Sequence, residues 1–124
     1  MTTWESGRES SLLDDIIAAH KTIEGRLNRG KFAQYKIGDT IQLRRDVRNE
    51  DGVLEDGAPD AARVSIVDIC SYPDFLSLVT AEGYRRIIPS ARSAAEAAAQ
   101  YNSYYTTDDQ KRFGVLAIEI KLEK

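Results

Sequence analysis

Residues 21–32 read KTIEGRLNRGKF, and this stretch holds four cations and one carboxylate among few apolar side chains. A segment that serves only to fill a core would carry a larger share of apolar residues. If the chain turns here from a helix into a strand, Lys21, Glu24 and Arg26 converge around one small pocket. An ammonium, a carboxylate and a planar guanidinium together suit a polar, planar or anionic ligand.

The residues before this stretch have the pattern of a short amphipathic helix. Ser11 followed by Asp14 is a variant of the capping box, with Asp in place of Glu. Four apolar residues then fall on one helical stripe, namely Leu12, Leu13, Ile16 and Ile17. The sequence therefore predicts a helix over residues 11–20.

From residue 22 the pattern changes to the alternation of a strand. One face carries Ile23, Gly25 and Leu27, whereas the other carries Thr22, Glu24 and Arg26. Glu24 and Arg26 are therefore expected on the same face of one strand.

Further strands are predicted at residues 40–45, 63–70 and 113–122, where β-branched and apolar residues crowd or alternate. Helices are predicted to begin at residues 73–74, ending at Gly83, and at a capping box formed by Ser93 and Glu96. Acidic clusters at 49–52 and 55–57 indicate a solvated, hairpin-like excursion. Because no regular βαβ units occur, we predict one α+β domain spanning 1–124, a small β-barrel or strongly curved sheet with flanking helices.

Composition and charge restrict the function. The net charge is −3, which argues against sequence-blind coating of nucleic acid. Residues 20–48, however, hold eight Lys or Arg and three acids, a local +5 that leaves −8 on the remainder. This asymmetry predicts one cationic face that receives phosphate or another anion.

Targeting and metal signals are missing from the sequence. It has neither an apolar run of about 18 residues nor the pattern of a secretion signal, so we expect a cytoplasmic protein with no membrane partner. One cysteine, Cys70, and one histidine, His20, cannot form a zinc site or an internal disulfide. Glycine-rich nucleotide motifs are absent as well, so neither a metal nor a cofactor is expected.

The charged stretch resembles the signature of the ASCH family, a branch of the PUA-like superfamily, which is Gly-x-Lys-x-x-Glu-x-Arg. Residues 19–26 read AHKTIEGR, so Lys21, Glu24 and Arg26 match and Ala19 replaces the opening glycine. The resemblance continues through residues 36–41, 67–75 and 104–118, in the family's order. It implies a PUA-like β-barrel with helices beside it and a cleft lined by the signature residues.

The resemblance also implies a function, because the family is thought to bind RNA or nucleotides. The alternative is a hydrolase: one similar subfamily removes the acetyl group of N4-acetylcytidine, using a lysine, a threonine nucleophile and a downstream glutamate. Lys21 matches that lysine, whereas Glu24 stands at the threonine's position. Lys21 and Glu24 are therefore the candidate catalytic residues of such an amidohydrolase or of a ribonuclease, and whether the chain is an enzyme stays open. Thr22 is a nearby hydroxyl but is better explained as a strand residue.

The predicted ligand-binding residues surround the signature. The cations supply charge, Phe32 stacks on a base, and Glu24 accepts an amine or acts as general base. Tyr101 and Tyr105 lie on an apolar stripe and are expected in the core, whereas Tyr104 points elsewhere and is the better pocket candidate. The predicted set is Lys21, Thr22, Glu24, Arg26, Asn28, Lys31, Phe32, Ser71, Tyr72 and Tyr104. The expected partner is RNA or a nucleotide, and a protein partner stays open.

Overall fold

The structure is a computed structural model that describes residues 1–57 and 61–123. Its strands are β1 (Thr3–Glu9), β2 (Ile23–Leu27), β3 (Thr40–Arg48), β4 (Leu54–Asp56), β5 (Ala62–Tyr72) and β6 (Val115–Leu122). Its helices are α1 (Ser10–Ile17), α2 (Phe75–Glu82), α3 (Ala94–Asn102) and α4 (Thr107–Phe113), with short 3₁₀ turns η1 (Gly30–Gln34) and η2 (Tyr84–Arg86). The predicted α+β class is confirmed.

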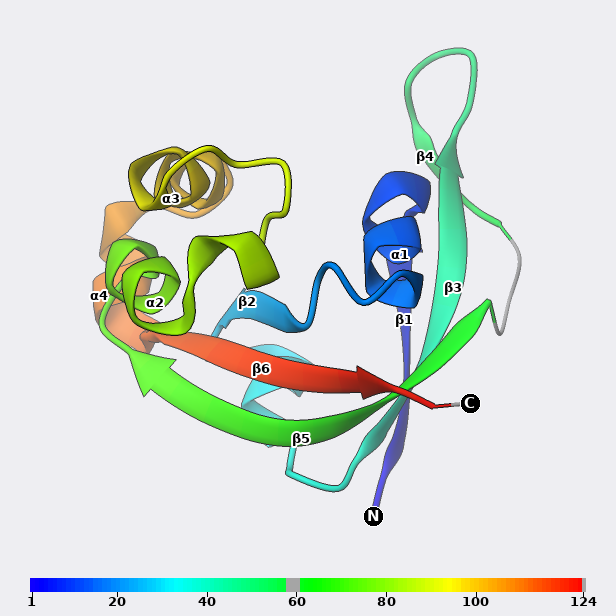
Figure 1. The fold of residues 1–124 in the computed structure, drawn as a ribbon, viewed down its shortest axis with the longest axis horizontal. Coiled ribbons are helices and arrows are strands. Elements are labelled where there is room, and N and C mark those ends of the chain that lie inside the picture. Colours follow the sequence, from blue (N-terminus) through cyan, green and yellow to red (C-terminus); the bar gives the residue numbers. More distant parts are fainter. Residues whose placement is uncertain (58–60, 124) are drawn as a thin grey trace.

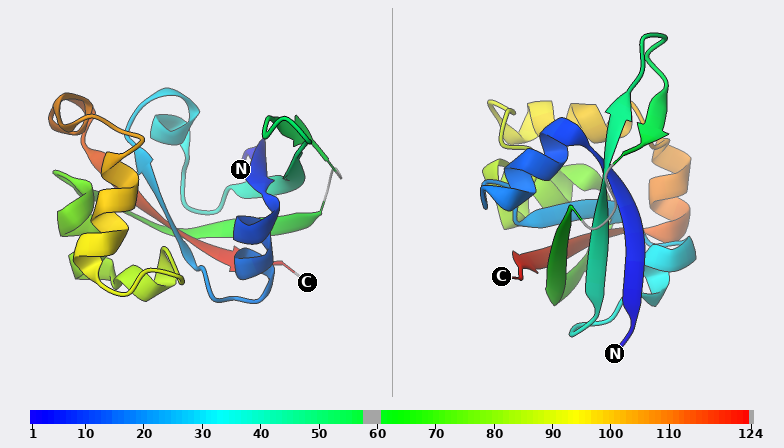
Figure 2. Two further views of the ribbon diagram at one scale, coloured as in Figure 1. Left: turned by 90° about the horizontal axis from the view of Figure 1, so that it is seen from above. Right: turned by 90° about the vertical axis from the view of Figure 1, so that its right-hand side faces the viewer.

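The strands form one strongly curved sheet in the order β1-β3-β5-β6-β2, with β4 paired to β3. β1 runs parallel to β3, whereas β2 runs antiparallel to β6. Figures 1 and 2 show α2, α3 and α4 at one end of the molecule and α1, β1 and β3 at the other, with β5 and β6 between them. The β3–β4 hairpin projects from the body, as the acidic clusters predicted.

The predicted barrel is not confirmed, because the sheet does not close. β1 and β2 are its two edges, and within the described ranges 1–57 and 61–123 no backbone ladder joins them. Closure would need the two edge strands to pair through main-chain hydrogen bonds. The alternative that the sequence allowed, a curved open sheet with flanking helices, describes the architecture correctly.

Two elements were missed, β1 and α4. β1 reads TWESGRE, in which only Thr3 and Trp4 favour strands, and its place in the sheet comes from pairing with β3. α4 reads TDDQKRF, which is too polar and short to show helical periodicity. The sequence nonetheless contains an N-cap for α4, since Thr106 Oγ1 accepts a hydrogen bond from the Asp109 N–H at 3.1 Å.

The predicted helix starts have mixed outcomes. Asp74 and Ser93 cap α2 and α3 by accepting the N–H of Ser77 (2.8 Å) and Glu96 (3.1 Å), as expected. The capping box predicted at Ser11 is wrong, because α1 begins at Ser10 and has no side-chain cap. The apolar stripe of α1 is also narrower than predicted: Leu13 and Ile16 are buried, but Leu12 and Ile17 are 38% and 40% exposed.

Two apolar cores lie on opposite faces of the sheet. The first packs β2 and β6 against α2 and α3, and the second lies between α1, β3, β5 and β6. β6 contributes side chains to both cores: Val115 and Ala117 belong to the first core, and Leu116 and Ile118 belong to the second. β2 pairs with β6 so that Glu24 lies beside Ile118 and Arg26 beside Leu116. The two charged residues therefore share the face of the second core.

α1 is followed by a residue in the left-handed conformation. Ala19 has φ +62°, the only positive φ among the described non-glycine residues. This is the position where the ASCH signature has glycine. A left-handed alanine costs about 1–2 kcal/mol, because its Cβ crowds the following carbonyl. Replacement of the glycine by Ala19 therefore preserves the turn at the expense of backbone strain.

Ala19→Gly is expected to stabilise the protein by roughly 0.5–1 kcal/mol, since relief of the strain exceeds the added entropy of the unfolded chain, about 0.4–1 kcal/mol. Urea unfolding measures this change. The matched control is Ala18→Gly, because Ala18 is equally exposed but has φ −77°. The control should lose about 0.5–1 kcal/mol. Equal destabilisation by both substitutions would show that the backbone at Ala19 is not strained.

Candidate functional site

Glu24 is a buried carboxylate whose two oxygens are both occupied. It is 3% exposed, and Arg8 donates one hydrogen bond to each of its carboxylate oxygens, with Nε–Oε2 at 2.7 Å and Nη2–Oε1 at 2.8 Å. Arg26 Nη2 donates a third hydrogen bond to Oε2 at 3.1 Å. The predicted proximity of Glu24 and Arg26 is confirmed.

Arg8 is the residue that the sequence analysis missed. It is 4% exposed, and its Nη1 donates to Ser6 Oγ at 2.5 Å and to the Gly7 carbonyl at 2.7 Å. The weak signal for it is alternation, since Trp4, Ser6 and Arg8 fall on one face of β1 and are the most buried part of it. Because β1 is far from β2 in the sheet order, the sequence gives no indication that Arg8 and Glu24 meet.

The surroundings of Glu24 keep it ionised. Burial raises the pKa of this carboxyl, but Arg8 and then Arg26 lower it, and the two guanidinium groups hold the pKa well below its usual range. A carboxylate in this state is a poor proton donor or acceptor near neutral pH. The geometry therefore favours a positioning role for Glu24 over the predicted general-base role.

Lys21 lies close enough to Glu24 for their charges to interact, but it does not touch the carboxylate. It is 6% exposed, and Nζ donates to the backbone carbonyls of Ile23 (3.0 Å) and Ile87 (2.5 Å). Burial lowers the pKa of this ammonium to about 8, against the opposing effect of Glu24. Lys21 and Thr22 both line a small hollow of about 110 Å³ beside Ile16 and Ile120.

Three cations gather around Glu24, and we call Arg8, Arg26 and Lys31 the cationic cluster. Arg26 Cζ lies 5.1 Å from the centroid of the Phe32 ring, and Lys31 Nζ lies 5.5 Å from the same centroid. Lys31 Nζ also donates to the Glu5 carbonyl at 3.1 Å. The pKa of Lys31 is lowered by partial burial, then by Arg8 and Arg26. Lys31 therefore lies in a field with excess positive charge.

A second group of cations surrounds an aromatic ring, Phe113, and includes Arg29 from the turn after β2. Arg29 and Arg112 lie 5.4 and 5.1 Å from the centroid of Phe113, and Arg29 also pairs with Asp109 at 3.8 Å. Asn28, between the two groups, is exposed and its N–H donates to the Gly114 carbonyl. The turn from β2 to η1 is thus flanked by guanidinium groups stacked on phenylalanine rings.

The tyrosines of α3 and its following turn take different positions. Tyr101 stacks on Phe75 with ring centroids 4.3 Å apart, and its Oη accepts the Gly25 N–H at 3.2 Å. A Cβ at position 25 would lie 2.9 Å from the Tyr101 ring, so glycine is needed for this close approach. Tyr105 also packs on Phe75, as expected for a core residue. Tyr104 is 82% exposed and remains a predicted contact.

The other predicted residues lie apart from Glu24. Thr22 Oγ1 accepts a hydrogen bond from Arg86 Nε at 3.2 Å, and Tyr72 Oη donates to Glu82. Ser71 is exposed next to Tyr72 on β5. The structure therefore divides most of the predicted set among the surroundings of Glu24, the Lys21 hollow and the end of β5, and leaves Asn28 and Tyr104 exposed outside these three places.

The arginines of β3 are engaged in ion pairs. Arg44 pairs with Asp46 at 2.6 Å, Arg45 with Asp14 at 2.9 Å and Arg48 with Glu9 at 3.1 Å. Their charges are therefore neutralised by neighbouring acids. They are less suited to phosphate than the cationic cluster.

Cys70 and His20 carry no site. Cys70 is half-buried, and burial followed by the charge of Asp68 raises the pKa of its thiol, so it is a weak nucleophile. His20 is exposed, 3.9 Å from Asp15. Within residues 1–57 and 61–123, no group of three or more His, Cys, Asp or Glu side chains is placed to hold a metal ion.

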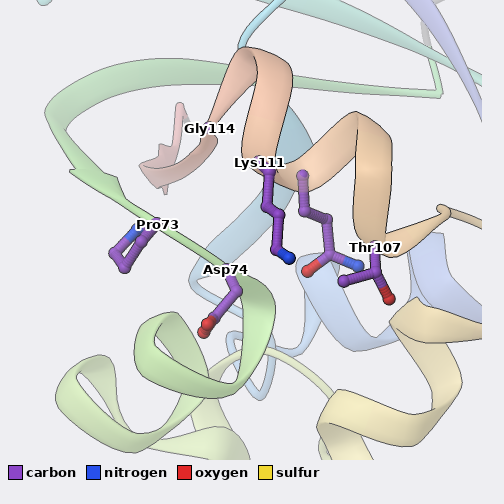
Figure 3. A pocket seen from close by; sticks show the side chains of 6 residues that line it. Pro73, Asp74, Thr107, Lys111 and Gly114 are labelled. Carbon is purple, nitrogen blue, oxygen red and sulfur yellow. The ribbon is translucent and has the colours of Figure 1, made fainter.

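A larger hollow lies at the opposite end of β2. It has a volume of about 370 Å³ and lies between the start of α2 and α4, lined by Pro73, Asp74, Thr107, Gln110, Lys111 and Gly114 (Figure 3). Gln110 is buried there, but its Oε1 accepts the Phe75 N–H and its Nε2 donates to Asn102 and Tyr105. Because its buried polar group is satisfied and Glu24 lies elsewhere, this hollow is not the centre of the site.

Glu24→Gln is expected to destabilise the protein at pH 7 by about 2–4 kcal/mol, since two guanidinium groups lose their buried counter-charge. The folded pKa of Glu24 lies below its unfolded value, so its contribution is complete above about pH 4.5 and is lost as the pH falls toward the folded pKa. The difference in unfolding free energy between wild type and variant should therefore shrink below pH 4.5. Denaturant titrations from pH 7 to pH 3 measure it, with exposed Glu50→Gln as a control that should stay within about 0.5 kcal/mol of wild type. A pH-independent difference would contradict the ionised state of Glu24.

Comparison with known proteins agrees with this arrangement. The family model described as the ASCH domain matches residues 10–124. The crystal structure of hypothetical protein PH0355 is similar, with 30% identity, a TM-score of 0.81 and coverage of 98% of this chain and 100% of that one. The solution NMR structure of protein PF0455 from Pyrococcus furiosus has 30% identity, a TM-score of 0.76 and 99% coverage of both chains.

Two further findings complete the comparison. No curated protein matches the sequence. Among the described residues, no helix is both long and apolar enough to cross a membrane. With the signature residues Lys21, Glu24 and Arg26 at the start of β2, and a family match over residues 10–124, the chain belongs to the ASCH domain family.

Proposed function

We propose that this domain binds single-stranded RNA or a nucleotide over the cationic cluster and the turn from β2 to η1. The observation that carries the proposal is the stacking of Arg26 on Phe32 with Lys31 near the same ring. Cations that track a phosphate backbone and aromatic rings that stack on bases are the two elements of sequence-tolerant recognition of single strands. The ASCH resemblance implies the same class of ligand.

The charge balance supports an anionic ligand. The cationic cluster places three cations against one carboxylate, Glu24, which leaves a local excess of +2. Burial lowers the pKa of Lys31, and the positive charges of Arg8 and Arg26 lower it further. A phosphate near Lys31 would offset the repulsion from Arg8 and Arg26. Phosphate binding would therefore favour the protonated form of Lys31, and the protonated form would favour phosphate binding.

The turn after β2 extends this surface. Arg29 and Arg112 on Phe113 repeat the arrangement of Arg26 on Phe32. Arg29 is half-exposed at 50% of its side chain, so a phosphate can reach it. A ligand longer than one nucleotide would contact both groups, which favours a short single strand as the ligand.

Lys31→Ala is expected to weaken binding of a short single-stranded RNA roughly tenfold and to reduce the salt dependence of binding by about one phosphate contact. Fluorescence anisotropy with a labelled oligonucleotide at several salt concentrations measures both quantities. Arg26→Ala should weaken binding further, provided that circular dichroism shows it folded. The control is exposed Lys121→Ala on β6, which should leave the affinity unchanged. Equal affinity of all four proteins would refute the proposed surface.

The second candidate function is hydrolysis of a modified nucleoside such as N4-acetylcytidine, or of RNA. The observation that favours it is Lys21, whose pKa of about 8 belongs to a buried amine lining a hollow together with Thr22. A neutral amine can take a proton from a hydroxyl or a water, and burial makes that form accessible near neutral pH. Glu24 is not the nucleophile in this scheme, because its oxygens are held by three N–H groups.

If this scheme is correct, activity on N4-acetylcytidine or single-stranded RNA should rise through about pH 8 as Lys21 loses its proton, and Lys21→Met should abolish it. Product formation followed by chromatography between pH 6 and pH 9 tests this expectation. Lys36→Met, at an exposed lysine, should retain the wild-type profile. Absence of product at high protein concentration, with and without added metal ions, would exclude these two reactions.

A further inference from the structure

Two buried polar atoms lie without a hydrogen-bond partner beside one aromatic ring. Among the side chains of the described residues, Arg26 Nε and Tyr35 Oη are the buried nitrogen and oxygen atoms that make no hydrogen bond. Arg26 Cζ lies 5.1 Å from the Phe32 centroid, and the Tyr35 ring meets the Phe32 ring edge-on at 5.4 Å. The two atoms therefore belong to one locality, although they come from β2 and from the residue after η1.

Both atoms are hydrogen-bond donors. An arginine keeps its Nε–H at any physiological pH. Tyr35 is 6% exposed, and burial raises the pKa of its hydroxyl, so it also keeps its proton. Native proteins rarely leave buried donors unpaired, because each loses its hydration without compensation. Two such donors around one ring are more simply explained by a ligand acceptor than by two independent defects.

The charge around Arg26 Nε and Tyr35 Oη indicates which kind of acceptor they would bind. The charge of Arg8 acts on Tyr35, and the charges of Lys31 and Arg26 act on each other. Glu24 cannot serve as the acceptor, because both of its oxygens already accept hydrogen bonds from Arg8. Nζ of Lys31 uses two of its three N–H groups on Glu5 and Ser6. The free donors thus outnumber the free acceptors here, and the excess charge is positive. An oxygen that carries negative charge satisfies both conditions.

We infer that Arg26 Nε and Tyr35 Oη form a phosphate subsite beside Phe32, in which both donate hydrogen bonds to the oxygens of one phosphate group. This inference rests on the proposed function and deepens it, because it names the part of the nucleotide that enters. Phe32 is half-buried and contacts both residues, so its ring must turn aside to admit the phosphate. Lys31, near the same ring, then supplies the third N–H and the charge.

The test is Tyr35→Phe, which removes Oη and keeps the ring that packs on Trp4 and Phe32. Binding of uridine 5′-monophosphate and of uridine is followed by NMR titration for wild type and variant. We expect roughly tenfold weaker binding of the monophosphate, little change for uridine, and an unfolding midpoint that does not fall, since the lost hydroxyl had no partner. The control is Tyr84→Phe, whose hydroxyl donates to the Arg92 carbonyl away from the cluster, and its affinity should equal that of wild type.

The outcomes separate this inference from the proposed function. If wild type binds RNA through Lys31 but Tyr35→Phe binds the monophosphate equally well, the subsite is wrong and the proposed function stands. If uridine loses as much affinity as the monophosphate, a base carbonyl occupies the position and the phosphate assignment is wrong. If wild type does not bind RNA, the proposed function fails, and an NMR titration with inorganic phosphate then tests the subsite by itself. A saturable shift of the Arg26 Nε–H resonance that is absent in Tyr35→Phe supports it, and no shift overturns it.

Discussion

The Arg8–Glu24 pair joins the two edges of an open sheet. Glu24 lies on the face of β2 that continues the second core, beside Ile118 of β6. An ionised carboxylate in such surroundings is strongly disfavoured unless a cation and hydrogen bonds compensate for its lost hydration. Arg8 supplies both from β1, the opposite edge. The curvature of the whole sheet must therefore bring β1 and β2 to within the combined length of the Arg8 and Glu24 side chains.

This side-chain connection leaves the two edge strands unpaired with each other, whereas a backbone ladder would join them. Between β1 and β2 the chain places η1, and Lys31 Nζ donates to the Glu5 carbonyl on the free edge of β1. An edge strand covered in this way is protected from pairing with another chain. Phe32, Lys31 and Arg26 thus lie in the opening between the two edges. The open sheet and the candidate ligand surface are consequences of the same arrangement.

The sequence predicted the parts of this arrangement that depend on local pattern. Alternation placed Glu24 and Arg26 on one face, and the caps at Asp74 and Ser93 marked two helices correctly. It did not predict Arg8, because β1 has no apolar alternation and gains its position from parallel pairing with β3, 37 residues later in the register Thr3↔Thr40. Long-range pairing of a polar strand leaves no trace in a local window. The same reason explains why Tyr35, which is buried by contacts with Trp4 and Phe32, was not among the predicted site residues.

The hydrogen-bond capacity of the signature residues favours recognition over catalysis at Glu24. A general base needs a free lone pair in reach of a substrate proton, and a nucleophile needs an exposed oxygen. Glu24 has its oxygens held by three N–H groups, and Lys21 directs Nζ at two main-chain carbonyls. The group that remains unsatisfied is the Nε–H of Arg26, which Glu24 orients by binding the neighbouring Nη2. The buried ion pair therefore holds the Arg26 guanidinium in a fixed plane against Phe32, and in the proposed phosphate subsite the effect of Glu24 on the ligand passes through Arg26.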